Sequence, residues 1–285
     1  MVARSNPTLL RRQLGAELRR IRERAQRSVA DVARSVGWSE SKLSRIETAN
    51  SGMRKADLET LLDVYTIADS DRARITALFG QAQQRAWWEA YGDALPDAYE
   101  ALIGFEAEAT AIFSYQAQLV PGLLQTAEYA SAIMRSLVFS RPELIEERLA
   151  VRLARQAVLA RDRAPEFWAI LDEAVLRRPV GGPDVMRRQL LRLVEASERP
   201  TIGIQVLPFA VGIHRGMEGS FVILEFDDKA GGGPLVYCEG MTGGVFRSKP
   251  AELRSYLMSF EALRAAALPP EESIDFIKAL ATAEG

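Results

Sequence analysis

The sequence contains a single cysteine, Cys238, and a single histidine, His214. One cysteine excludes an internal disulfide framework and fits a reducing cytoplasm. One cysteine with one histidine also supplies too few ligands for a zinc site, so we expect no metal and no cofactor. No apolar run approaches the roughly 18 residues that a membrane-spanning helix needs. The first residues, MVARSNPTLLRRQLG, lack the apolar core of a secretory signal, so we expect a cytoplasmic protein.

The chain also has little net charge, −2 in total, yet its charges are unevenly distributed. Residues 1–55 carry 13 Lys and Arg against 5 Asp and Glu, a net charge of +8. Residues 56–285 carry 23 against 33, a net charge of −10. A basic N-terminal part followed by an acidic remainder indicates that only the N-terminal part meets a polyanion. With 285 residues the chain is long enough for two domains.

Residues 28–47, SVADVARSVGWSESKLSRIE, have the spacing of two short helices separated by a tight bend. Val32 and Val36 belong to the apolar face of the first helix, and Leu43 and Ile46 to that of the second. Gly37 lies between them, where a reversal of the chain favours glycine. An ordinary αα-hairpin shares this spacing. The glycine bend and the polar face of the second helix favour a helix-turn-helix, whose second helix lies in the DNA major groove.

The second helix of this motif begins after Ser39, which is placed as its N-cap, and carries short or charged side chains. We expect DNA contacts from Ser39, Glu40, Ser41, Lys42 and Arg45. Arg45 is spaced for a bidentate contact with guanine, and Glu40 for accepting a hydrogen bond from a cytosine amino group. Alternatively, Glu40 points away and complements the helix dipole. Lys42, together with Arg54 at the entry of the next helix, is expected to contact phosphates.

The segment GAELRRIRERAQRSVADVARSVGWSESKLSRIETANSGMRKADLETLLDVY resembles the phage-repressor-like helix-turn-helix family, also called the xenobiotic-response-element type. In that family an arginine late in the first helix pairs with a glutamate that ends the recognition helix. Arg22 and Glu47 fall at those positions, so the resemblance implies a structural ion pair rather than base reading. The sequence departs from the family at Val29, where several members carry a glutamine that contacts phosphate. That contact is either absent here or replaced by one from Arg27, Ser28 or Arg54.

The rest of the chain divides into further helices and a region of short apolar runs. Helical spacing over 8–24, near 55–65 and from about 70 completes an all-α five-helix helix-turn-helix domain. We place this domain at residues 1–68, a helical connector at 69–110 and a larger α+β domain at 111–285. Apolar runs at 111–116 and 166–174 predict strands, and four later runs between Gly and Pro residues, within 202–249, predict an antiparallel sheet.

The later segments YQAQLVPGLLQTAEYA, EFWAILDEAVLRRPVGG and VYCEGMTGG resemble an uncharacterised domain that follows a repressor-type helix-turn-helix in many actinobacterial regulators. The resemblance covers nearly the whole of residues 106–280 and implies a transcriptional regulator, without a particular ligand. Such regulators are often encoded beside a small partner protein, so a small protein and a small-molecule effector both stay open. One helix-turn-helix domain contacts few base pairs, and we therefore expect a homodimer on a two-fold operator in double-stranded DNA.

His214 lies in a glycine-flanked loop, GIHRGMEG, and is the candidate for a ligand contact. The alternative, which we favour, is an exposed loop residue. No second histidine accompanies it, and Cys238 falls within an apolar strand pattern, so we expect no catalytic residues and no enzyme. The leading interpretation is a DNA-binding transcription regulator whose larger domain senses an effector. An antitoxin-like or adaptor module that uses DNA binding for autoregulation is the alternative.

Overall fold

The structure is a computed structural model that describes residues 7–49, 52–65, 67–83, 95–137, 144–227, 233–241 and 243–283. The chain divides into two compact units. The first comprises the described residues of Met1–Ala90, Pro96–Glu108 and Asp227–Gly232, and the second those of Tyr91–Leu95, Ala109–Phe226 and Gly233–Gly285. None of the described helices is both long and apolar enough to cross a lipid bilayer.

The first unit is helical. Its described helices are α1 (Pro7–Arg24), α2 (Val29–Ser35), α3 (Glu40–Glu47), α4 (Lys55–Tyr65), α5 (Asp69–Ala82) and α6 (Asp97–Glu108). The all-α N-terminal domain expected from the sequence is therefore confirmed. Residues 84–94 of the expected connector lie outside the described residues.

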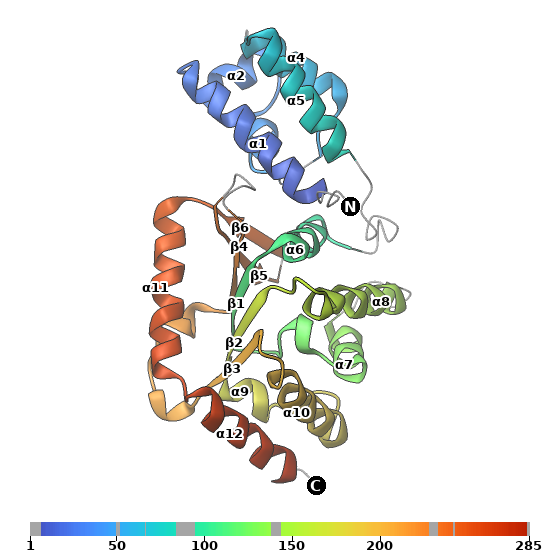
Figure 1. Cartoon of the computed structure of the whole chain (residues 1–285), viewed down its shortest axis with the longest axis vertical. Coiled ribbons are helices and arrows are strands. Elements are labelled where there is room, and N and C mark those ends of the chain that lie inside the picture. Colours follow the sequence, from blue (N-terminus) through green and yellow to red (C-terminus); the bar gives the residue numbers. More distant parts are fainter. Residues whose placement is uncertain are drawn as a thin grey trace. The chain divides into compact units, whose positions relative to one another are not determined.

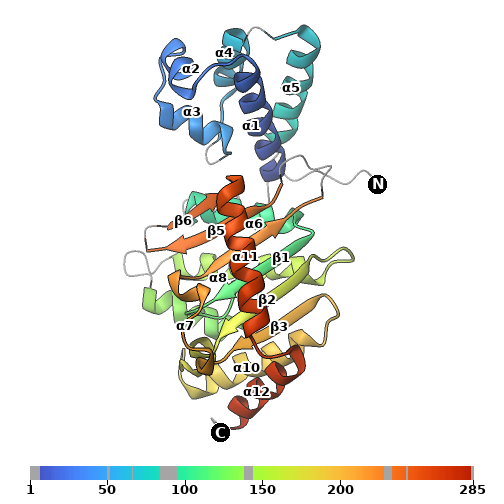
Figure 2. The ribbon, with the colours of Figure 1, turned by 90° about the vertical axis from the view of Figure 1, so that its left-hand side faces the viewer.

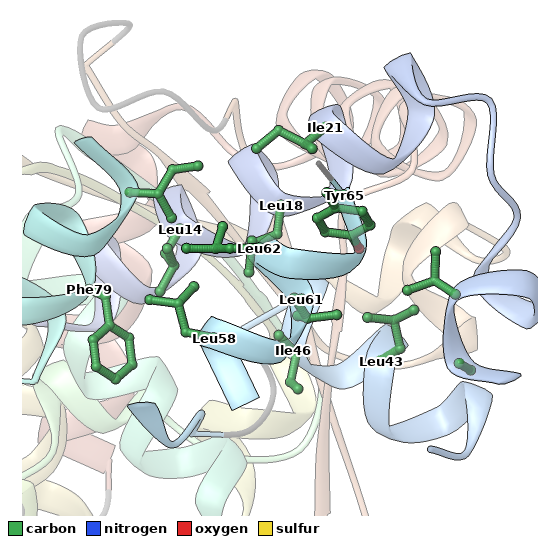
Figure 3. Packing of buried hydrophobic residues seen from close by; sticks show 13 residues of the cluster. Leu14, Leu18, Ile21, Leu43, Ile46, Leu58, Leu61, Leu62, Tyr65 and Phe79 are labelled. Carbon is green, nitrogen blue, oxygen red and sulfur yellow. The ribbon is translucent and has the colours of Figure 1, made fainter. Parts of the chain in front are cut away.

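The core of the first unit gathers apolar side chains from helices α1 to α5 (Figure 3). The i, i+4, i+7 spacing places Leu14, Leu18 and Ile21 on one stripe of α1, which faces the other helices. Helix α5 lies beyond the expected domain boundary at residue 68, yet its Ile75 and Phe79 belong to the same core. The remaining buried members are Val32, Ala33, Leu43, Ile46, Leu58, Leu61, Leu62 and Tyr65.

The second unit is a β-sheet with helices on both faces. Its strands are β1 (Ala111–Gln116), β2 (Glu166–Asp172), β3 (Ile202–Leu207), β4 (Phe221–Glu225), β5 (Leu235–Gly240) and β6 (Gly243–Arg247). Its α-helices are α7 (Ala127–Leu137), α8 (Ile145–Arg155), α9 (Glu173–Arg177), α10 (Pro183–Ser197), α11 (Pro250–Ala266) and α12 (Pro270–Ala283). Short 3₁₀ helices are η2 (Gly122–Leu124), η4 (Gln156–Ala160), η5 (Phe209–Val211) and η6 (Arg215–Glu218).

Among the described residues, six strands pair in the order β3-β2-β1-β4-β5-β6. The β1–β2 and β2–β3 pairs are parallel, and the other pairs are antiparallel. The α+β class is confirmed, and β4, β5 and β6 pair antiparallel as expected, but β3 pairs in parallel with β2, so the sheet as a whole is mixed. The reason is connectivity: α7 and α8 lie between β1 and β2, and α10 lies between β2 and β3. A helical crossover returns the chain to the starting edge and makes the next strand parallel.

Helix α11 crosses one face of the sheet, whereas α7, α8 and α10 lie on the other (Figures 1 and 2). Phe260 and Leu263 of α11 join a buried cluster with Tyr115 and Phe221 from the strands. At the β3 edge of the sheet, α12 packs against β3 and α10, and the Val206 N–H donates to the Ser273 Oγ of α12. The sheet core is therefore closed by helices on both faces, and the carboxyl ends of β1 and β2 lie beside the loop that carries η5 and η6.

Candidate nucleic-acid interface

The two helices of the predicted motif are held at their N-termini by serine caps. The Ser28 Oγ accepts a hydrogen bond from the Asp31 N–H (3.1 Å), and the Asp31 carboxylate accepts one from the Ser28 N–H (3.2 Å), which forms a capping box. The Ser39 Oγ accepts from the Lys42 N–H (3.2 Å) and caps α3. Gly37 has φ +68°, the left-handed conformation that the bend requires. The sequence thus folds into α2, a tight turn and α3.

Helix α3 presents one apolar and one polar face. Leu43 and Ile46 are buried in the helical core. The exposed positions are Glu40, Ser41, Ser44 and Arg45. The Arg45 side chain makes no hydrogen bond or ion pair with any described residue and is available to an external acceptor. The polar face of α3 is therefore open to a ligand in this unit, as a recognition helix requires.

Arg22 and Glu47 form a bidentate ion pair between α1 and the end of α3. The Arg22 Nε and Nη2 donate to the two carboxylate oxygens of Glu47 at 2.7 and 2.8 Å. Their side chains are only 9% and 4% exposed. The Arg22 Nη1 also donates to the Arg27 C=O (2.9 Å). The hydrogen bonds to Glu47 raise the pKa of Arg22, so the pair stays charged and fixes α3 against α1.

Arg27 and Ser28, the expected substitutes for a glutamine contact to phosphate, make contacts within the chain. The Arg27 guanidinium donates to the Val64 C=O (3.3 Å) and also to the Ser35 hydroxyl. Ser28 is occupied as the cap of α2. Arg54, at the entry of α4, has an exposed side chain. Of these three, Arg54 has the geometry best suited to a phosphate contact.

The ammonium group of Lys42 also contacts other residues of the first unit. Its Nζ lies 2.8 Å from Oδ1 of Asp57 on α4 and 3.8 Å from the ring centroid of Trp38. Trp38 and Asp57 were not singled out from the sequence. Two features of the sequence could have predicted this contact. Trp38 and Lys42 are four residues apart, and Asp57 is the third residue of α4, a position where an acidic side chain caps a helix.

Gly15 on α1 was also not predicted from the sequence to have a structural role. A Cβ at Gly15 would lie 2.6 Å from the Glu47 carbonyl oxygen and 2.7 Å from that of Ile46. Glycine therefore permits α1 and the end of α3 to approach each other closely. A glycine within an otherwise helical pattern was the signal for this contact.

His214, the sequence-based ligand candidate, lies in the second unit near the carboxyl ends of β1 and β2. Its Nδ1 accepts from the Gly216 N–H (3.2 Å), and its Nε2 is 3.6 Å from Oδ2 of Asp172. Its ring meets Tyr115 edge-on, with centroids 6.1 Å apart. The side chain is 13% exposed, so the expectation of an exposed loop residue is wrong. These contacts attach the loop to the sheet, and a ligand role for His214 stays a prediction.

Within the described part of the chain, no group of three or more His, Cys, Asp and Glu residues is placed to hold a metal ion.

Two family models match the chain. The model described as a Helix-turn-helix domain matches residues 13–75, which include α2, the turn and α3. The model described as a Domain of unknown function (DUF5753) matches residues 99–279, which include every strand of the sheet. No curated protein and no solved structure matches the chain. The helix-turn-helix predicted from residues 28–47 is confirmed by the first match.

Proposed function

The chain belongs to the DUF5753 family, and from this membership and its helix-turn-helix domain we propose that it is a sequence-specific DNA-binding transcription regulator of the phage-repressor-like type. The observation that carries the proposal is the polar face of α3. Leu43 and Ile46 anchor the helix in the core, while Glu40, Ser41 and Arg45 are exposed on its other face. The excess of positive charge in residues 1–55 supports attraction to the phosphate backbone.

Arg45→Ala tests whether α3 reads bases. Loss of a bidentate contact to guanine should weaken binding to the preferred duplex by about 1–3 kcal/mol and relax selection at one base position. The preferred duplex is first selected from a random library with the native chain, and fluorescence anisotropy then measures affinity. Arg34→Ala removes an equal charge from the exposed side of α2 and is the matched control. Equal weakening of Arg45→Ala on the preferred and on a random duplex would contradict base reading.

In this proposal two chains bind a two-fold operator as a homodimer, because one helix-turn-helix contacts few base pairs. The larger unit receives an effector, either a small molecule or a small protein, and has no catalytic activity. Purification of the full chain from its native cell, followed by mass spectrometry for both classes, tests the effector. If neither a small molecule nor a small protein is recovered in a stoichiometric amount while DNA binding is intact, the larger unit does not sense an effector.

A further inference from the structure

The strongest unassigned feature of the molecule is a contact between the turn of the helix-turn-helix, α3 and α4. The Lys42 ammonium lies between the ring of Trp38, in the turn, and the carboxylate of Asp57, on α4. We propose that Lys42 is a positioning residue that fixes the recognition helix for base reading and does not contact phosphate. This inference rests on the proposed function and changes the role that the sequence predicted for Lys42.

The first argument is the occupation of the ammonium group. Its Nζ is 2.8 Å from Asp57 Oδ1 and 3.8 Å from the Trp38 centroid, distances of an ion pair and of a cation–π contact. The Lys42 side chain is 36% exposed and that of Asp57 is 20% exposed. A phosphate would have to compete with this partly buried carboxylate for the charge of the ammonium. Because Asp57 neutralises the charge of Lys42, the pair adds little attraction for a polyanion.

The second argument is that Asp57 is itself fixed. Its Oδ2 accepts from the Arg54 N–H (3.3 Å), which is the N3 half of a capping interaction at the start of α4. Burial raises the pKa of Asp57, but the hydrogen bonds from Lys42 and from the Arg54 backbone lower it more, so the net shift is downward. The carboxylate therefore stays charged at neutral pH and joins α4 to α3.

The third argument is where this contact lies in the interface. The Lys42 N–H donates to the Ser39 cap, so the same residue is bound at the first turn of α3 through both its backbone and its side chain. Arg45 follows one turn later on α3, and Arg54 precedes α4. The Lys42–Asp57 pair thus sets the spacing between a base-reading side chain and a phosphate-facing one. Phosphate contacts orient a protein on DNA and base contacts specify the sequence, so this spacing affects specificity.

Asp57→Asn distinguishes the two roles through the ratio of affinities for the preferred and the random duplex. The ratio stays unchanged if the carboxylate only adds negative charge and falls if the carboxylate positions α3. Removal of a negative charge near DNA should strengthen binding to every duplex if Asp57 has no positioning role. We expect instead that Asp57→Asn lowers the ratio of affinities for the preferred and the random duplex by about tenfold. Asn retains an oxygen that accepts from the Arg54 N–H, so the cap of α4 is preserved. Glu59→Gln, an exposed carboxylate on the same helix, is the matched control and should leave the ratio unchanged.

Lys42→Met provides the second readout, because it keeps an unbranched apolar side chain beside Trp38 and removes the ammonium. We expect the affinity ratio to fall while the slope of log affinity against log salt stays at the native value. A lost phosphate contact would reduce that slope by about 0.9. That reduction, with equal weakening on both duplexes, would overturn the inference, as would Asp57→Asn and Glu59→Gln behaving alike. If the native chain selects no preferred duplex, the proposed function itself fails before any variant is compared.

Discussion

At the scale of the residue, the buried pair of Arg22 and Glu47 is costly to break from one side. Glu47→Ala leaves the guanidinium buried without its carboxylate, and we expect the free energy of unfolding of the first unit to fall by about 3–5 kcal/mol. Urea unfolding of the full chain, with hydrogen exchange at the amides of α1 and α3, measures the loss. Arg19→Ala breaks the exposed Arg19–Glu23 pair and should cost only about 0.2–1 kcal/mol. Equal losses for the two variants would show that the buried pair has no special structural role.

A second residue-scale prediction concerns two carboxylates at one end of the sheet. Ala111 of β1 lies between Glu166 of β2 and Glu225 of β4. Burial, and then the charge of Glu166, raises the pKa of Glu225 above its ordinary value of 4.5. A carboxyl group whose pKa is higher in the folded than in the unfolded state favours folding when protonated, so its ionisation costs stability as pH rises.

Glu225→Gln should therefore raise the free energy of unfolding of the second unit at pH 7, and the gain over the native chain should vanish below about pH 4.5. Thermal unfolding from pH 3 to pH 8 measures the difference. A gain that persists unchanged at low pH would contradict the electrostatic cause.

The ion pair of Arg22 and Glu47 was predictable because a family resemblance fixed both positions in advance. The contacts that Lys42 and Arg27 make within the chain were not predictable, because a cation on a polar helix face has the same sequence signature whether it meets a phosphate or an acceptor of its own chain. The partners are distant: Asp57 lies on the next helix, and the Val64 C=O is a backbone group without a sequence signal. Burial of His214 likewise depends on Asp172 and Tyr115, which come from separate strands.

At the scale of the element, the close crossing of α1 and α3 depends on Gly15. Gly15→Ala places a Cβ 2.6 Å from the Glu47 carbonyl oxygen, so the helices must separate. We expect a cost of about 1–3 kcal/mol, measured as a lower melting temperature of the first unit. Gly80→Ala on α5, whose Cβ would meet nothing within 4 Å, should instead stabilise its helix by about 0.5–1 kcal/mol. A destabilising effect of both variants, or a stabilising effect of Gly15→Ala, would contradict the packing argument.

Helix and strand positions were largely predictable, because apolar periodicity determines them locally. The direction of pairing was predicted correctly for β4, β5 and β6 but incorrectly for β3. The run at 111–116, the helical patterns after it and the run at 166–174 together had the form of a β–helix–β unit, which pairs in parallel. The four later runs lack helices between them and favour antiparallel pairing. The strand β3 fits both patterns. It follows a helix after β2 and pairs with β2 in parallel, but in the sequence it also comes directly before the antiparallel strands.

At the scale of the whole molecule, the proposed homodimer on a two-fold operator would fix the distance between half-sites. We expect half-sites about one helical turn, roughly 34 Å, apart. Insertion of about five base pairs moves one half-site to the opposite face of the duplex and should reduce affinity to that of a single half-site. Mobility-shift titration with the full chain measures this, and analytical ultracentrifugation gives the number of chains per duplex. Binding that is indifferent to the insertion, with one chain per duplex, would contradict the dimer.

The order of strands in the sheet has a consequence for biosynthesis. β1 is flanked by β2 on one side and by β4 on the other, and Tyr115 lies opposite Phe221, far along the chain. Helices α1 to α5 can fold as soon as they leave the ribosome, because their contacts are local. At about 5–20 residues per second, translation leaves the nascent β1 with an unpaired edge for on the order of ten seconds before β4 emerges. The edge of β1 is therefore open to non-native strand pairing during translation, whereas the helices α1 to α5 present no such edge.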